Sequence, residues 1–184
     1  PQGDGATALH WAVHRSDLET TDALIEAGAN VNAANDLGVT PLWLACLNGD
    51  AAGADRLLRA GASANVVLPS GETALMTASR TGRVAAVRAL LRQGADVDTT
   101  EGSHGQTALM WAVSESHHGV ARLLLSRGAA PGAATADGFT PLLLAAAAGD
   151  IALAETLLAA GIDVNETGSD DTHVLPYAIV NRQD

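Results

Sequence analysis

Apolar and polar positions along the chain recur with a period of about 33 residues. A Gly-x-Thr-x-Leu pattern appears five times, and its threonines are spaced by 33, 33, 34 and 33 residues. The copies are Gly5-Thr7-Leu9, Gly38-Thr40-Leu42, Gly71-Thr73-Leu75, Gly105-Thr107-Leu109 and Gly138-Thr140-Leu142. A second pattern, Leu-(Leu/Ile)-x-x-Gly, keeps the same step from Leu24 to Gly161. Repetition at such a period is the signature of a repeat architecture.

Each cycle predicts two short helices. Threonine before an apolar run is a good N-cap, and proline suits the first helical turn at Pro41 and Pro141. The first helix is expected to run for about two turns. Glycine or serine should break it, at Ser16, Gly49, Gly82, Ser116 and Gly149. A second helix should then carry the paired leucines on its buried side and end at the next glycine.

These helix pairs predict an all-α fold built by stacking. A single pair is too small to bury its own apolar side, whereas stacked neighbours bury it together. We expect one domain over residues 1–184, with repeats at about 3–35, 36–68, 69–102, 103–135 and 136–168, and a partial sixth at 169–184.

The repeat unit resembles the ankyrin repeat, whose signature is Thr-Pro-Leu-His-x-Ala in a unit of about 33 residues. The first cycle reads Thr-Ala-Leu-His-Trp-Ala over residues 7–12, and Thr-Pro-Leu begins at Thr40 and Thr140. The likeness covers essentially the whole chain. It implies an ankyrin-repeat solenoid of helix-turn-helix units joined by β-turn or hairpin loops.

The chain departs from the family pattern in three places. The histidine after leucine occurs only at His10, so the other four turns are expected to rely on packing. The 34-residue step places one extra residue in the loop at 99–105, and Pro131 interrupts the fourth repeat. The sixth unit stops before a second helix and the chain begins at Pro1 rather than Met, so we expect a piece of a longer protein.

Charge narrows the classes of partner. The chain has 10 basic and 21 acidic residues, a formal net charge of −11. This charge repels phosphate backbones and anionic membrane surfaces, so nucleic-acid binding is not expected. No apolar stretch approaches the roughly 20 residues of a membrane helix, so membrane insertion is not expected either. The single cysteine, Cys46, can form no internal disulfide and is expected to be a small buried apolar residue rather than a reactive thiol.

The resemblance also implies where a partner binds. Ankyrin-like proteins generally use the concave side, formed by turn tips and the exposed side of each first helix. The residues that this pattern selects are Leu37, Val39, Leu47, Asn48, Glu72, Arg80, His104, Gln106, Glu115 and Phe139. The apolar group of Leu37, Val39 and Leu47 and the lone Phe139 are features that often mark interfaces, although isolated exposed apolar residues are common on any surface.

The tryptophans and the histidine pair each have two interpretations. Trp11 and Trp111 occupy matching positions and Trp43 lies one place earlier, so we expect packing between first helices, with the indole N–H on a turn carbonyl, over partner anchoring. His117-His118 is expected to be a solvated helix start, because adjacent histidines point to different helix faces and suit no metal.

The function that these features predict is a protein–protein interaction module. The alternative is a targeting or regulatory arm of a larger enzyme or effector. No nucleophilic triad, phosphate loop or dinucleotide fingerprint is present in the sequence, so no catalysis and no cofactor are expected. We expect a monomer. The compartment stays open, with the cytoplasm favoured over the periplasm or the exterior.

Overall fold

The computed structural model describes residues 3–165, which form ten α-helices arranged as five pairs. The helices are α1 (Ala8–His14), α2 (Leu18–Glu26), α3 (Pro41–Asn48), α4 (Ala51–Arg59), α5 (Ala74–Arg80), α6 (Val84–Arg92), α7 (Ala108–Ser114), α8 (His118–Ser126), α9 (Pro141–Ala147) and α10 (Ile151–Ala159). No β-strand occurs among these residues, so the all-α prediction is confirmed.

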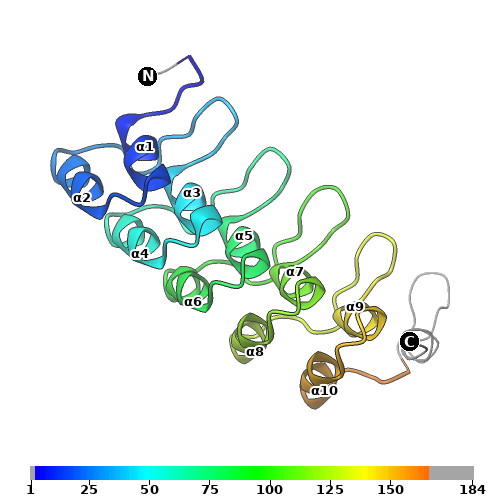
Figure 1. Cartoon of the computed structure of the whole chain (residues 1–184). Helices are drawn as coiled ribbons and strands as arrows, with labels where there is room; N and C mark the ends of the chain where they lie inside the picture. Colours follow the sequence, from blue (N-terminus) through cyan, green and yellow to red (C-terminus); the bar gives the residue numbers. More distant parts are fainter. Residues whose placement is uncertain (1–2, 166–184) are drawn as a thin grey trace.

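The pairs stack into a solenoid with two rows of helices (Figure 1). We term the odd-numbered helices the first helices and the even-numbered ones the second helices. The loops at 3–6, 33–39, 66–72, 99–106 and 133–139 are termed fingers one to five; they project from the row of first helices on the side away from the second helices. Consecutive first helices pack on one another, and so do consecutive second helices.

Every first helix begins as its threonine predicts. Thr7, Thr40, Thr73, Thr107 and Thr140 are N-caps with extended backbone, and each hydroxyl accepts the N–H of the residue three places on. Such a cap contributes about 1 kcal/mol of helix stability. Proline occupies the first turn of α3 and α9, where its missing N–H costs nothing.

The prediction that four of the turns rely on packing alone is wrong for two of them. In the first repeat, His10 Nδ1 accepts the backbone N–H of Thr7 at 3.1 Å, and Nε2 lies 2.9 Å from the carbonyl of Val39. Met76 Sδ accepts the N–H of Thr73 at 3.4 Å, and Met110 Sδ does the same for Thr107. A thioether is a weak acceptor, but it reaches the N–H that histidine takes in the first repeat.

The break between the two helices of each pair is a left-handed residue. Gly49, Gly82 and Gly149 have φ near 70°, and Ser16 and Ser116 adopt φ of 52° and 54° at the same place. Sequence reasoning missed a further signal that begins the second helix: Asp17, Asp50 and Asp150 are its N-caps in three repeats, each accepting a backbone N–H.

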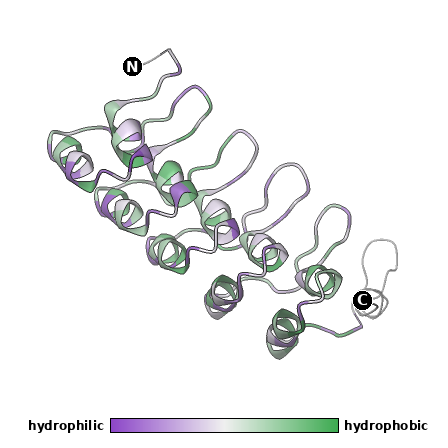
Figure 2. Cartoon of the chain, in the orientation of Figure 1, coloured by the Kyte–Doolittle hydropathy of each residue, from purple (hydrophilic) through white to green (hydrophobic). Residues whose placement is uncertain are grey.

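The interior is a continuous stripe of leucine, alanine and valine. The leucine of the first pattern is at most 1% exposed in all five repeats. The first leucine of the second pattern is fully buried in repeats two to five, whereas Leu24 of α2 is only partly buried and packs against the edge of the same core. Hydrophobic colouring extends over most of α9 and much of α10, where Ile151 is 58% exposed (Figure 2).

The fingers are joined by backbone hydrogen bonds at three of their four contacts. Asp36 N donates to the Asp4 carbonyl, Gly102 N to Ser70, and Ala136 N to His104, at 2.7–3.0 Å. Between fingers two and three the donor position is taken by Pro69, which has no N–H. Its ring packs against Gly38 instead.

The extra residue of the fourth cycle lies in finger four, as predicted. Thr100 and Thr107 form an isolated β-bridge, and between them the chain folds around Glu101. This carboxylate is 8% exposed and accepts the backbone N–H groups of Ser103, His104 and Gln106. Glu101 therefore holds finger four together.

Side chains also tie the loops that follow the second helices. Asn32 donates to the Gly61 carbonyl and accepts from Ser63 N, and Asn65 repeats both bonds one cycle later. Asp98 keeps only the accepting bond, from Ala130 N. The predicted sixth unit at 169–184 lies outside the described residues.

Candidate binding surface

The ten residues selected from the sequence all lie on fingers or at the ends of first helices. We term this side of the solenoid, formed by the fingers and the first helices with their C-caps, the finger face (Figure 1). Leu37, Val39, Glu72, His104, Gln106 and Phe139 come from fingers two to five, and Leu47, Asn48, Arg80 and Glu115 come from α3, α5 and the C-cap of α7. The repeat thus brings residues spread over 103 positions onto one side.

Among the ten selected residues, the exposed apolar ones belong to the second repeat, while Trp11 on α1 and Val67 on finger three add apolar surface that is 42% and 49% exposed. Leu37 is 71% exposed at the tip of finger two, and Leu47 is 37% exposed near the end of α3. Val39, two residues before α3, is half-buried, and its carbonyl lies against His10. Leu37 and Leu47 therefore expose apolar surface that the fold does not use.

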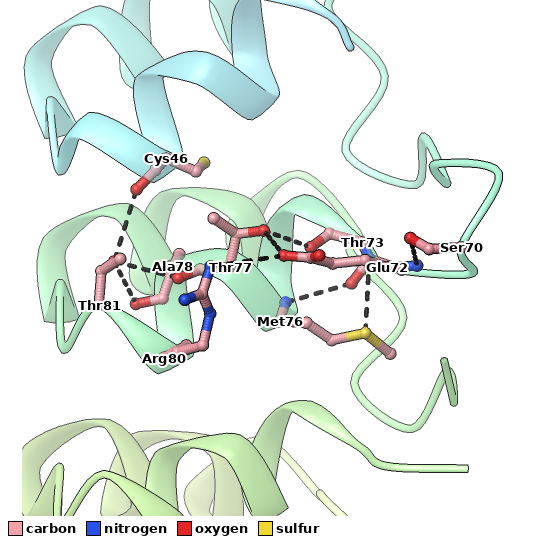
Figure 3. Close-up of polar contacts among 9 residues, drawn as sticks. All are labelled: Cys46, Ser70, Glu72, Thr73, Met76, Thr77, Ala78, Arg80 and Thr81. Atoms are coloured by element: carbon pink, nitrogen blue, oxygen red, sulfur yellow. Dashed lines mark hydrogen bonds and ion pairs between the residues drawn. The ribbon is translucent and has the colours of Figure 1, made fainter. Parts of the chain in front are cut away.

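A polar network lies at the centre of the finger face (Figure 3). The Thr77 hydroxyl donates to Glu72 Oε1 at 2.6 Å, and Arg80 reaches the same oxygen at 4.0 Å. The Arg80 guanidinium lies 5.3 Å from the centroid of the Trp111 ring, a cation–π contact. Sequence reasoning missed Thr77, which is fully buried, because threonine inside a helix gives no signal of a side-chain partner.

Asn48 also links its repeat to the preceding one. Its side-chain amide donates to the His14 carbonyl at 3.1 Å and so caps the end of the preceding first helix. Thr81 occupies the same place one repeat later and contacts the Cys46 carbonyl at 3.5 Å. These residues tie neighbouring repeats together, and only the remaining exposed part of Asn48 is free to meet a partner.

His104 and Gln106 flank the buried carboxylate of finger four. The His104 side chain is 66% exposed, with its Nδ1 3.8 Å from Glu101. Burial acts to raise the pKa of Glu101, but the N–H groups of Ser103, Gln106 and His104 outweigh it and hold that pKa below its ordinary value. Glu101 is thus a structural anion that sets the positions of both neighbours.

Glu115 and Phe139 differ in how freely they meet solvent. Glu115 is exposed at the C-cap of α7. Phe139 is half-buried and packs against the hydrophobic core, so it is not the free aromatic that its sequence context suggests. Its backbone N–H is taken by the Thr135 hydroxyl.

Two of the three tryptophans follow the packing interpretation, without the expected hydrogen bond, and Trp11 does not. Trp43 and Trp111 pack partly buried against the core, yet neither indole N–H has a partner, so the prediction of a turn carbonyl as acceptor is wrong. Trp11 is 42% exposed and stacks edge-on with His14 at 5.9 Å. It lines a shallow depression at the α1–α2 end of the solenoid, where the described residues include no earlier repeat.

The adjacent histidines contact protein groups. His117 Nε2 lies 2.9 Å from the Arg80 carbonyl, and His118 Nε2 lies 3.0 Å from Asp150. Burial acts to raise the pKa of Asp150, but hydrogen bonds from Leu153 and Ser116 and the nearby His118 leave it below its ordinary value. Within residues 3–165, no three His, Cys, Asp or Glu side chains gather as metal ligands.

The second helices carry the paired charges expected of an outer face. Arg56 bonds to Asp22 at 2.8 Å, while Arg59 and Arg92 both reach Asp55, at 2.6 and 3.7 Å. Cys46 is fully buried, as predicted, and burial raises the pKa of its thiol to about 12. Among the described helices, none has the length and apolar character needed to cross a membrane.

Comparison with known proteins agrees with the architecture. A model of three ankyrin repeats matches residues 1–67 and 44–135, and a single-repeat model matches 137–169. The crystal structure of the ankyrin repeat domain of Bcl-3, described as a member of the IkappaB protein family, superposes with a TM-score of 0.86 at 30% identity, covering 95% of this chain and 80% of that one. The cell division cycle-related protein res1/sct1 of Schizosaccharomyces pombe is 56% identical over 39 residues, 21% of this chain and 6% of that protein. The chain belongs to the ankyrin repeat family.

Proposed function

We propose that the chain binds another protein through its finger face. Ankyrin repeats generally mediate protein–protein interaction, and binding a protein is therefore the activity that the family supports. The observation that carries the choice of surface is the exposure of Leu37 and Leu47 on one repeat of that face. Exposed apolar groups with polar neighbours are typical of contact surfaces.

Rigidity supports binding on a surface without a deep pocket. Backbone hydrogen bonds join the fingers at three of their four contacts, the Pro69 ring packs against Gly38 at the fourth, and Glu101 holds finger four in place. A surface that is already ordered loses little conformational entropy on association, so more of the contact energy appears as affinity. Catalysis is not part of this proposal, since ankyrin repeats generally mediate protein–protein interaction.

Two substitutions that introduce negative charge test the surface. Binders are first selected from a library of random peptides displayed on phage against the intact chain. In 300 mM salt, which screens attraction between the added carboxylates and a cationic binder, Leu37→Glu/Leu47→Glu should weaken the selected binders at least about tenfold. Each change replaces exposed apolar contact area by a carboxylate, and a tenfold loss of affinity corresponds to about 1.4 kcal/mol. Affinity is measured by fluorescence anisotropy, and folding by circular dichroism.

The matched control adds the same charge elsewhere. Ala52→Glu/Ala85→Glu changes two exposed positions on α4 and α6 and should leave the affinity unchanged. Equal weakening by both double variants, or none by either, would place binding away from Leu37 and Leu47.

A regulatory or targeting arm of a larger protein is the second candidate. The match spans only 39 residues, 6% of the length of the Schizosaccharomyces pombe relative, so in that protein the matching segment lies within a much longer sequence. Determining the gene sequence on both sides of residues 1–184 tests this candidate. An adjoining enzyme or effector domain supports it, and an open reading frame limited to ankyrin repeats contradicts it.

A further inference from the structure

Charges are unevenly divided between the two sides of the solenoid. Within residues 3–165, the finger face carries six carboxylates against two guanidiniums: Asp4, Asp36, Glu72, Glu101, Glu115 and Asp137 against Arg15 and Arg80. The second helices with their caps carry eight carboxylates against seven guanidiniums: Asp17, Glu19, Asp22, Glu26, Asp50, Asp55, Asp150 and Glu155 against Arg56, Arg59, Arg83, Arg88, Arg92, Arg122 and Arg127. Relative to its basic groups, the finger face therefore carries more acidic groups than the second helices do.

The two arginines do little to offset this charge. Arg80 is shared between Glu72, at 4.0 Å, and the face of Trp111. Arg15 lies at the C-cap of α1, at the end of the solenoid. Asp36 and Glu115 are exposed, and no ion pair involves either of them among the described residues.

The acidic groups lie beside the exposed apolar ones. Asp36 and Leu37 are adjacent at the tip of finger two, and Leu47 belongs to the same repeat. We infer that the finger face takes a cationic segment of a partner protein that carries apolar side chains among its arginines or lysines, with the apolar contact at the second repeat. This inference rests on the proposed function and names the chemistry of the partner.

The spacing of the fingers fits an extended segment. Packed helices lie about 8–10 Å apart, so successive fingers, each leading into a first helix, are separated by a similar step. An extended chain in the polyproline II conformation advances about 3.1 Å per residue with three residues per turn, so every third side chain points the same way and meets a new finger. A second copy of this chain is disfavoured as the occupant, because it brings a net charge of −11 of its own.

Three defined peptides test the chemistry. The first is a fluorescein-labelled dodecamer made of two Arg-Val-Ser-Arg-Leu-Ser units. The second replaces its arginines by glutamate, and the third replaces its valines and leucines by serine. The first should bind the intact chain at least tenfold more tightly than either of the others, and its affinity should fall as salt rises from 50 to 300 mM, because salt screens exposed charges.

Charge-removing variants test the location. Asp36→Asn/Glu115→Gln removes two carboxylates from the finger face, and Glu19→Gln/Glu26→Gln removes two exposed ones from α2. The first pair should weaken the arginine peptide about fivefold, whereas the second should change its affinity less than twofold. Equal effects would mean that only net charge matters, and would overturn the inference.

Amide chemical shifts on adding the arginine peptide separate the two proposals. Shifts at residues 33–39 and 66–72 support both the finger face as the binding surface and the cationic partner. If the glutamate peptide binds the fingers as tightly, or if the arginine peptide does not bind at 1 mM while library peptides bind the fingers, the cationic partner is wrong and the finger face stands. If the shifts are confined to the second helices, both proposals fail.

Discussion

At the scale of single residues, the residue type at an equivalent position of the repeat depends on the side chain that it faces in the next repeat. The break between the paired helices is glycine at Gly82, and the His117 ring lies so close that a Cβ there would be 2.7 Å from its Cε1. Where the next repeat supplies the shorter Asp150, the same position is Ser116, whose hydroxyl bonds to that carboxylate. Glycine at position 82 thus allows both the left-handed backbone and the close approach of the His117 ring.

Substitution of this glycine should cost more than backbone strain alone. Gly82→Ala forces a Cβ into the left-handed region, which costs about 1–2 kcal/mol, and it displaces the His117 ring from the Arg80 carbonyl for about 1 kcal/mol more. The control Gly28→Ala has a similar φ of 83° and nothing within 4 Å of the added carbon. Urea denaturation should show Gly82→Ala as the less stable of the two by about 1 kcal/mol; equal stabilities would contradict the packing argument.

At the scale of elements, fingers two, three and five share one pattern of backbone hydrogen bonds, and finger four departs from it. Finger four is built around the Glu101 carboxylate, while fingers two and three meet at Pro69 without the backbone bond that joins the others. The one-residue insertion in finger four is thus accommodated by an added buried anion rather than by a disordered loop. The shape of the finger face therefore depends on the hydrogen bonds of Glu101 and on the packing of Pro69.

The buried carboxylate predicts a pH dependence with a definite sign. Because the folded pKa of Glu101 lies below its ordinary value of 4.5, its stabilising effect is present above pH 4.5 and is lost as the pH falls through the folded pKa. The free energy of unfolding should therefore fall in acid. In Glu101→Gln part of that fall should disappear, because the amide oxygen accepts hydrogen bonds without titrating. Parallel pH profiles of the two proteins by urea denaturation would show that Glu101 makes no such contribution.

At the scale of the whole molecule, the sequence predicted the stack far better than the surface. The fold follows from Thr7 and its four counterparts and from the leucine pairs, because every repeat meets the same kind of neighbour and periodic residues keep the same environment. The surface depends on exceptions to the period. Asn48 bonds to the preceding helix, Phe139 packs inward, and Thr77 supports Glu72; none of these contacts is visible without the neighbouring repeat in place.

The location of binding on the finger face is the claim on which the functional account depends. Hydrogen–deuterium exchange of the intact chain, with and without a peptide selected from the random library, tests it most directly. Amides in fingers two to four, at residues 33–39, 66–72 and 99–106, should exchange more slowly in the complex, while those of the second helices should be unchanged. Protection confined to residues 18–26, 51–59 and 84–92 would contradict the account.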